Sequence, residues 1–142
     1  MDKKAFTIKE LLFVIGVFIV MIAVLGPFVR MAKVRANRVE CANNLRRISL
    51  GIHGYEADHN GAFPETLGVL YPDYIQEESA FDCPAGKSVG TKEKPDYVYI
   101  KGVTELSPPK TVLVEDADGN HGKRSKNVLR LDGAVDWVSG RR

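Results

Sequence analysis

The residues best suited to chemistry in this chain are its histidines, its cysteines and one acidic stretch. The histidines are His53, His59 and His121. His53 and His59 are six positions apart, which is off the i, i+4 spacing that lets two helical histidines share a metal ion. The chain also contains no paired-histidine motif and no phosphate-binding glycine loop, and its one Gly-x-Ser-x-Gly stretch, residues 86–90, lies in a loop-rich region rather than at a strand-to-helix turn. We therefore expect a protein that is not an enzyme.

The densest group of potential oxygen ligands is EDADGNH, residues 115–121. Asp116, Asp118 and Asn120 form an Asp-x-Asp-x-Asn run, which can bind Ca²⁺ through side-chain and backbone oxygens. The stretch departs from the EF-hand pattern, because its glycine comes early and Asn127 stands where a glutamate is required. Two interpretations stay open: a Ca²⁺ site, or a polar loop in which His121 is exposed or hydrogen-bonded. We expect no other cofactor.

One acid, Glu10, stands at the start of the most apolar segment of the chain. Residues 11–29 carry no charged side chain and would form about 28 Å of helix, close to the ~30 Å hydrocarbon core of a bilayer. No small-x-small cleavage site follows, so we expect a retained transmembrane helix rather than a signal peptide. An acid at the centre of such a helix costs about 2.5–3.5 kcal/mol. Glu10 therefore either has a positive partner in an assembly or lies among the lipid headgroups without a role.

The two cysteines, Cys41 and Cys83, are far apart in sequence and belong to no Cys-x-x-Cys pair. The histidines are not spaced along the chain to complete a zinc site with them. Beyond a membrane span, in a compartment that permits oxidation, a single disulfide linking a helix to a loop is favoured over two unrelated buried thiols.

Helical spacing continues after the apolar run. One stripe recurs at three- and four-residue steps: Val34, Arg38, Cys41, Leu45, Ile48, Ile52, Tyr55 and His59. Asn60-Gly61 is a helix stop signal. The pattern predicts one helix over about residues 7–60, roughly 80 Å long, with a bend at Pro27.

The remainder of the chain predicts short elements separated by loops. We expect a short helix at 66–70 and strands at 97–101, 112–115, 127–131 and 134–138, the last two joined by a two-residue hairpin at Asp132-Gly133. The predicted fold class is α+β: a long N-terminal helix, transmembrane in its first half, packed on a small antiparallel β-sheet.

The N-terminal region resembles the type IV pilin and type II secretion pseudopilin superfamily. The resemblance rests on Lys3-Lys4-Ala5, then Phe6-Thr7-Ile8-Lys9-Glu10-Leu11-Leu12, then the apolar run with its proline. Downstream, the chain is similar to a branch of that superfamily with a C-terminal His…Asp-Gly signature, here His121 and Asp132-Gly133. Further matching stretches are Cys41-Ala42-Asn43-Asn44-Leu45-Arg46, Phe63-Pro64, Leu70-Tyr71-Pro72 and Phe81-Asp82-Cys83-Pro84.

The resemblance implies how the chain is processed and assembled. A prepilin peptidase would cut between Ala5 and Phe6 and the new N-terminus at Phe6 would be methylated. Phe6, Glu10 and Pro27 would belong to the assembly helix, with Glu10 pairing to the α-amino group of Phe6 in a neighbouring subunit. The implied organisation is a leader at 1–5, a transmembrane assembly helix at 6–29, an amphipathic outer helix at 30–60 and a small α+β domain at 61–142.

The implied partners are other copies of the chain, other pseudopilins, the prepilin peptidase, an inner-membrane assembly platform and membrane lipid. Bases cluster between Arg30 and Arg47, and residues 48–85 hold acids but no lysine or arginine. These blocks are either solvated faces or surfaces that meet between copies. Aromatic residues are not interleaved with the bases, so we expect no nucleic-acid partner.

The implied location is a bacterial inner membrane, crossed once, with the C-terminal domain periplasmic. Counting flanking bases slightly favours the opposite orientation, because Arg30, Lys33, Arg35 and Arg38 follow the span. We expect the C-terminal domain outside, since the leader must be cut on the cytoplasmic side and the cysteines suit an oxidising compartment. The alternative function is a single-span membrane protein that presents a small binding domain and never assembles.

Overall fold

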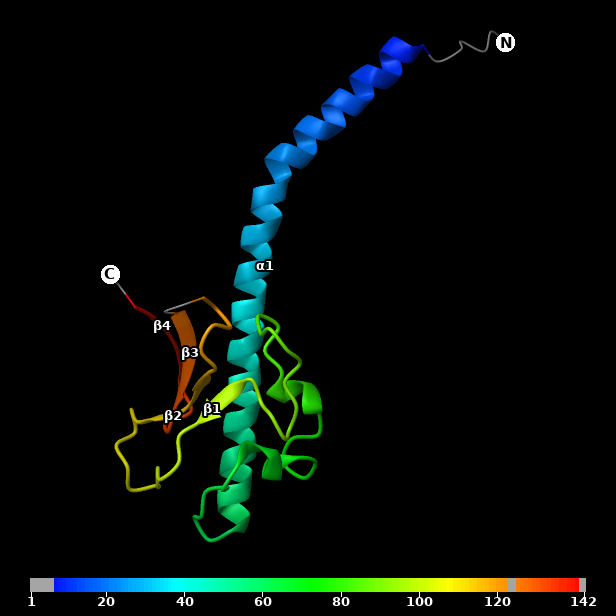
Figure 1. Ribbon diagram of the computed structural model, residues 1–142. Helices are drawn as coiled ribbons and strands as arrows, with labels where there is room; N and C mark the ends of the chain where they lie inside the picture. The colour runs from blue at the N-terminus through cyan, green and yellow to red at the C-terminus, as the bar shows by residue number, and fades with distance from the viewer. Residues whose placement is uncertain (1–6, 123–124, 141–142) are drawn as a thin grey trace. The chain divides into compact units, whose positions relative to one another are not determined.

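A computed structural model describes residues 7–122 and 125–140 of the chain. They form the predicted α+β layout, with one long helix, two short 3₁₀ helices and a small sheet (Figure 1). The chain divides into two compact units, residues 1–35 and residues 36–142.

Helix α1 runs from Ile8 to Asp58 and continues through Pro27. In the first unit its large apolar side chains are exposed throughout; Phe13, for example, is 74% exposed. The helix ends where the sequence predicts, because Asn60 (φ 54°) and Gly61 (φ 82°) both take the left-handed conformation and Gly61 N–H donates to the Glu56 carbonyl at 2.9 Å. Asn60, rather than Gly61, occupies the first left-handed position after the helix.

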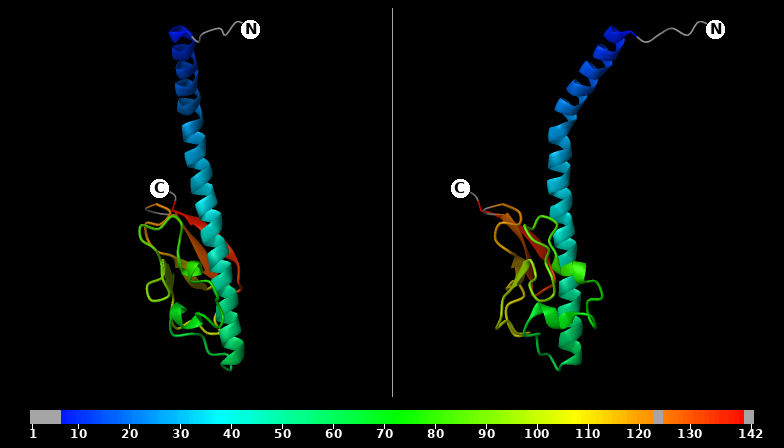
Figure 2. Two further views of the ribbon diagram at one scale, coloured as in Figure 1. Left: turned by 90° about the vertical axis from the view of Figure 1, so that its right-hand side faces the viewer. Right: turned by 45° about the vertical axis from the view of Figure 1, so that its right-hand side comes forward.

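The second unit packs its part of α1 against a four-stranded antiparallel sheet (Figures 1 and 2). The strands are β1 (Tyr97–Tyr99), β2 (Val112–Asp116), β3 (Ser125–Arg130) and β4 (Val135–Ser139), in spatial order β1-β2-β3-β4. The 3₁₀ helices η1 (Leu67–Leu70) and η2 (Glu78–Phe81) lie in the connection between α1 and the sheet. Each predicted strand is present to within two residues at either end.

The core of the second unit forms where the predicted helical stripe meets the sheet. Cys41, Leu45, Ile48 and Ile52 are fully buried and belong to one cluster with residues of the 3₁₀ helices and of strands β1, β2 and β3. Leu50, on another face of the same helix, is 75% exposed. The three- and four-residue spacing thus identifies the buried face correctly from Cys41 to Ile52, because side chains so spaced share one side of an α-helix. The two ends of the predicted stripe differ, since Val34 is 66% exposed and His59 is also exposed.

The hairpin between β3 and β4 differs from the prediction. Gly133 N–H donates to the Arg130 carbonyl and Arg130 N–H donates to the Ala134 carbonyl, both at 2.9 Å. These bonds enclose a three-residue loop, residues 131–133, so the predicted two-residue loop is wrong. Gly133 has φ 77°, and glycine takes this conformation at the end of a three-residue hairpin loop without a steric penalty.

Burial of one tyrosine makes the fold sensitive to alkali. Tyr97 is 3% exposed, and this burial, reinforced by the carboxylates of Asp116, Asp82 and Asp96, raises the pKa of Tyr97 well above its usual value. The folded chain then keeps a proton that the unfolded chain loses above pH ~10. The stabilising effect of the neutral Tyr97 is complete below that pH and is lost as pH rises, at up to about 1.4 kcal/mol per pH unit.

We expect Tyr97→Phe to lose less stability than the wild type between pH 9 and pH 11, roughly the range in which free tyrosine ionises. The measurement is urea unfolding of the full chain in detergent, followed by fluorescence of Trp137, the single tryptophan. Tyr99→Phe is the matched control, because burial also raises the pKa of Tyr99 but its side chain is only half-buried. Equal alkaline slopes in wild type and Tyr97→Phe would contradict the prediction.

Candidate functional site

Glu10, the acid at the start of the apolar segment, takes part in capping the N-terminus of helix α1. Glu10 Oε2 accepts hydrogen bonds from the Thr7 backbone N–H at 2.9 Å and from the Thr7 hydroxyl at 3.0 Å. In return, the Glu10 backbone N–H donates to Thr7 Oγ1 at 3.4 Å. This reciprocal pattern is a capping box, in which a threonine and a glutamate three positions later satisfy free N–H groups of the first helical turn.

The capping box is a role for Glu10 that the sequence reasoning above missed. Its signal is present in the sequence as Thr7-x-x-Glu10 directly before an apolar run. Ala5 and Phe6, the predicted processing residues, lie outside the described residues. Lys9, next to Glu10, is exposed.

Among the described residues, one helix, α1, is long and apolar enough to cross a membrane. None of the residues in its most apolar segment is buried. This apolar segment of α1 is therefore not part of the buried core, to which only the later residues of the same helix contribute. The first unit therefore fits the predicted transmembrane segment in length and composition.

Cys41 and Cys83 form a disulfide, as the sequence predicts. Their Cα atoms are 5.4 Å apart, within the usual range for this bond. The bond links helix α1 to the loop that follows η2. Two amide side chains add to this connection: Asn44 Nδ2 donates to the Asp82 carbonyl at 2.8 Å and Asn37 Nδ2 donates to the Pro84 carbonyl at 3.0 Å.

Two ionisable side chains lie against the disulfide. His121 Nε2 is 3.4 Å from Cys83 Sγ and 3.3 Å from Asp116 Oδ2, and both side chains are buried, at 3% and 0% exposed. Asp116 Oδ2 also accepts hydrogen bonds from the Asn127 backbone N–H (2.7 Å) and from Asn127 Nδ2 (3.0 Å). Asp116 Oδ1, equally buried, has no hydrogen-bond partner among the described residues.

Burial controls the charge state of this pair. Desolvation raises the pKa of the Asp116 carboxyl, opposed by its hydrogen bonds from Asn127. Desolvation also lowers the pKa of the His121 imidazole, opposed by the Asp116 charge and reinforced by Arg38. Burial thus favours the neutral His121 ring, in which one ring nitrogen is an acceptor for a proton or a metal ion.

An aromatic and cationic layer covers the histidine. The His121 ring meets the Trp137 ring edge-on, with centroids 5.5 Å apart, and the Arg38 guanidinium lies 4.0 Å from the Trp137 ring centre. Asn127 Nδ2 also contacts the Arg38 carbonyl at 3.3 Å. Helix α1 and strands β3 and β4 together restrict access to the cluster.

The predicted Ca²⁺ ligands have different surroundings. Asp116 is buried beside His121, whereas the Asp118 side chain is fully exposed and 3.9 Å from Lys126 Nζ. Asn120 Nδ2 donates to the Asp96 carbonyl at 3.1 Å. Among the described residues, Asp116 groups with Cys41, Cys83 and His121 as potential metal ligands. Ca²⁺ binding stays a prediction.

The other histidines lie elsewhere. His53 Nδ1 is 3.0 Å from the carboxylate of Glu56, and the His59 ring stacks on Tyr55 with centroids 3.7 Å apart.

Arg47, from the basic block, pairs with Glu77, from the acidic block, at 3.0 Å. This pair shows that part of the charge complementarity is satisfied within one chain.

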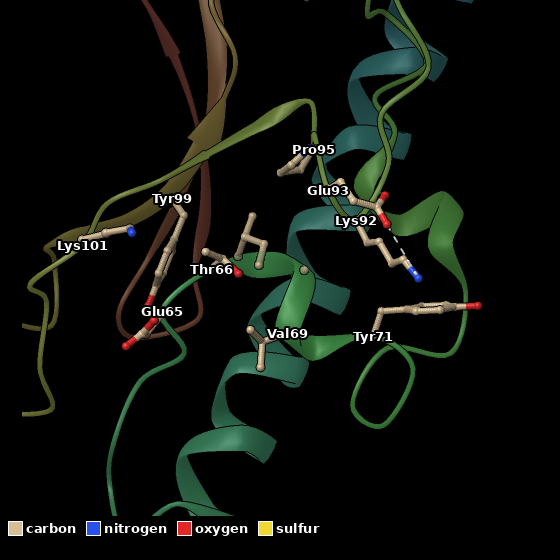
Figure 3. Close-up of a pocket in the computed structure, with 11 residues that line it drawn as sticks. Glu65, Thr66, Val69, Tyr71, Lys92, Glu93, Pro95, Tyr99 and Lys101 are labelled. Atoms are coloured by element: carbon tan, nitrogen blue, oxygen red, sulfur yellow. Dashed lines mark ion pairs between the residues drawn. The ribbon is translucent and has the colours of Figure 1, made fainter.

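A surface groove of about 540 Å³ lies between η1, the turn at residues 92–95 and β1. Figure 3 shows Lys92, Glu93 and Tyr71 at one end of the groove, and Tyr99 and Lys101 at the other. Lys92 Nζ is 3.8 Å from Glu93 Oε1 and 4.7 Å from the Tyr71 ring centre. Such pairing of a cation with an acid and an aromatic face is typical of a solvated surface.

Within residues 7–122 and 125–140, side chains converge at the helix start around Thr7 and Glu10 and at the buried cluster around the disulfide. The first suits capping and pairing with a positive charge, and the second suits thiol or metal chemistry. No family model, no curated protein and no solved structure matches this chain.

Proposed function

We propose that this chain is a pilin-like structural subunit. It is inserted in a bacterial inner membrane through helix α1, with the second unit on the periplasmic side. A prepilin peptidase cuts between Ala5 and Phe6 and the N-terminus of Phe6 is methylated. An inner-membrane assembly platform then extracts the subunit, and copies stack through their apolar helices, alone or with other pseudopilins, into a type II secretion pseudopilus or a related filament.

The observation that carries the proposal is the exposed apolar half of α1 with Glu10 at its start. About 19 apolar positions form a helix of membrane-spanning length, and their large apolar side chains are exposed among the residues that the structure describes. In lipid they face acyl chains, and in a filament they face the same segment of neighbouring subunits. One face of the second half of the same helix is buried against the sheet and the connecting loops, which suits a subunit that presents a small folded unit outside the assembly.

Glu10 would control the assembly step. Removal of residues 1–5 creates an α-amino group at Phe6, which did not exist before cleavage. When helices pack together away from water, the Glu10 carboxylate needs a positive partner, since an unpaired charge in a desolvated place is strongly destabilising. The amino group of a neighbouring subunit supplies that partner and sets the axial register of the filament.

The test is the intact mass and the N-terminal peptide of the protein purified from its own membranes. We expect a chain that begins at Phe6 and carries one added methyl group. A chain that still begins at Met1 would overturn the proposal, because the amine partner of Glu10 would then be absent.

A second candidate is a single-span membrane protein that presents its second unit as a binding domain and never assembles. The capping box supports this candidate, because Thr7 gives Glu10 hydrogen bonds within one chain and no neighbouring subunit is then required. An unprocessed N-terminus together with a monomeric state in detergent would favour it.

A further inference from the structure

The buried cluster around the disulfide has the composition of a transition-metal site. Cys41, Cys83, Asp116 and His121 each offer one ligand atom, and these atoms all lie within 4.8 Å of one another. They come from helix α1, from the loop after η2, from the end of β2 and from the turn that follows it. We propose that, in the thiol form of the chain, these four side chains bind one zinc ion.

The distances within the cluster approach those of a tetrahedral site. Zinc bonds of about 2.0–2.3 Å to nitrogen, oxygen and sulfur place neighbouring ligand atoms roughly 3.3–3.8 Å apart. His121 Nε2 is 3.4 Å from Cys83 Sγ, so one edge of the tetrahedron already has the required length, and the Asp116 carboxylate approaches the same nitrogen at 3.3 Å through its other oxygen, Oδ2. The two sulfur atoms, bonded to each other in the disulfide, must separate to about 3.8 Å once they are thiols.

The donor set favours zinc over the Ca²⁺ predicted for the neighbouring loop. Two thiolates and an imidazole are soft or intermediate ligands that Zn²⁺ prefers, whereas Ca²⁺ takes oxygen ligands in sets of six or more. Four protein ligands in a buried place, with no position left for water, are the arrangement of a structural zinc site.

One buried oxygen atom of Asp116 lacks a partner within the described part of the chain, which supports the binding of a metal ion at the cluster. Asp116 is fully buried, yet its Oδ1 has no hydrogen-bond partner among the described residues, which is costly for a buried polar atom. Its other oxygen is held by two hydrogen bonds from Asn127. Metal-binding carboxylates are commonly oriented by such outer hydrogen bonds.

Binding of zinc by the two cysteine thiols requires no oxidant or reductant. The cysteines are made as thiols, and Zn²⁺ with two thiols gives a zinc dithiolate and two protons. Formation of the disulfide passes two electrons from the same thiols to an external oxidant, such as the disulfide of another protein, and releases two protons. It excludes zinc, because neither sulfur remains a thiolate. Zinc and the disulfide are thus alternative ways to hold helix α1 to the loop after η2, and zinc would hold these elements together before oxidation.

The test uses the full chain in detergent, freed of metal and reduced anaerobically with a phosphine. Zinc is titrated against a chromogenic chelator, and Co²⁺ serves as a spectroscopic probe. We expect one zinc per reduced chain, none per oxidised chain, and a thiolate-to-cobalt charge-transfer band together with the d–d absorption of tetrahedral Co²⁺. Bound zinc should also protect both thiols from alkylation, counted by mass spectrometry.

Variants identify the ligands. His121→Ala and Asp116→Asn should each weaken zinc binding by more than about tenfold, and Cys83→Ser should remove most of the charge-transfer band. His59→Ala is the matched control, since this exposed histidine stacks on Tyr55 away from the cluster, and it should leave zinc affinity unchanged. Trp137 fluorescence of each oxidised alanine or asparagine variant reports whether its fold is intact.

Two results would overturn the proposal. The first is a reduced wild-type chain that binds zinc no better than Cys83→Ser or whose cobalt complex lacks the thiolate band. The second is a folded His121→Ala variant with wild-type zinc affinity. If His121→Ala does not fold, the cobalt spectrum and the alkylation count of the wild type decide the question alone.

Discussion

Glu10→Gln is expected to abolish filament assembly while leaving the chain in the membrane with its second unit folded. Glutamine can replace glutamate in a capping box, so this variant keeps the helix start and removes only the charge. Loss of one partner of a desolvated ion pair costs about 3–5 kcal/mol, which is roughly two to three and a half powers of ten in each subunit contact at about 1.4 kcal/mol per tenfold. The measurement is electron microscopy of sheared filaments with quantitation of membrane-bound and filament fractions.

Thr7→Ala is the matched control, since it removes the hydroxyl that accepts from Glu10 N–H and keeps the charge. If the charge matters, Thr7→Ala assembles and Glu10→Gln does not. The reverse pattern, with Glu10→Gln filaments as abundant as those of the wild type, would mean that helix capping is the whole role of Glu10. The pairing mechanism would then be wrong even if the N-terminus is processed at Phe6.

Removal of the Cys41–Cys83 disulfide is expected to destabilise the second unit strongly. The bond closes a sequence separation of 42 residues, for which chain-entropy arguments give about 4 kcal/mol. We expect the double variant Cys41→Ala/Cys83→Ala to lose about 3–5 kcal/mol of unfolding free energy, including the small cavities left by two buried sulfurs. Urea unfolding of the full chain in detergent, followed by Trp137 fluorescence, measures this loss.

A chelator must be present in that experiment, so that zinc bound to reduced chains does not add stability through mass action. Leu50→Ala is the matched control on the same helix, because Leu50 is 75% exposed and its truncation should change the unfolding free energy by less than about 0.5 kcal/mol. A loss below about 1 kcal/mol in the double cysteine variant would show that the unfolded chain is already restrained without the bond.

Local patterns in the sequence predicted most of the elements, because their signals lie within a few residues of one another. The three- and four-residue stripe of Cys41, Leu45, Ile48 and Ile52 identified the buried helix face, and β-branched runs located the strands. The hairpin at Asp132-Gly133 was found at the right place with the wrong loop length. That length depends on which strand residues pair, which a dipeptide does not specify.

The start of helix α1 carries a local capping signal that the sequence-based prediction of a role for Glu10 did not include. Thr7-x-x-Glu10 is a capping pattern readable from four residues, and the structure places both side chains in the corresponding hydrogen bonds. The pairing of Arg47 with Glu77 was less accessible. Many acids in residues 48–85 could meet each base of the preceding block, and only packing selects one.

The sequence alone determined that this chain has a membrane-length apolar helix, a continuous amphipathic extension and a small α+β unit, since each follows from composition and periodicity. It also favoured the pairing of Cys41 with Cys83. Only the tertiary structure decided that Asp116 and His121 lie against that pair. The four residues are separated by 42, 33 and 5 positions, and no short-range spacing relates a helix, a loop and a strand end. Their meeting depends on how α1 packs on the sheet, because the long-range contacts of the buried core bring them together.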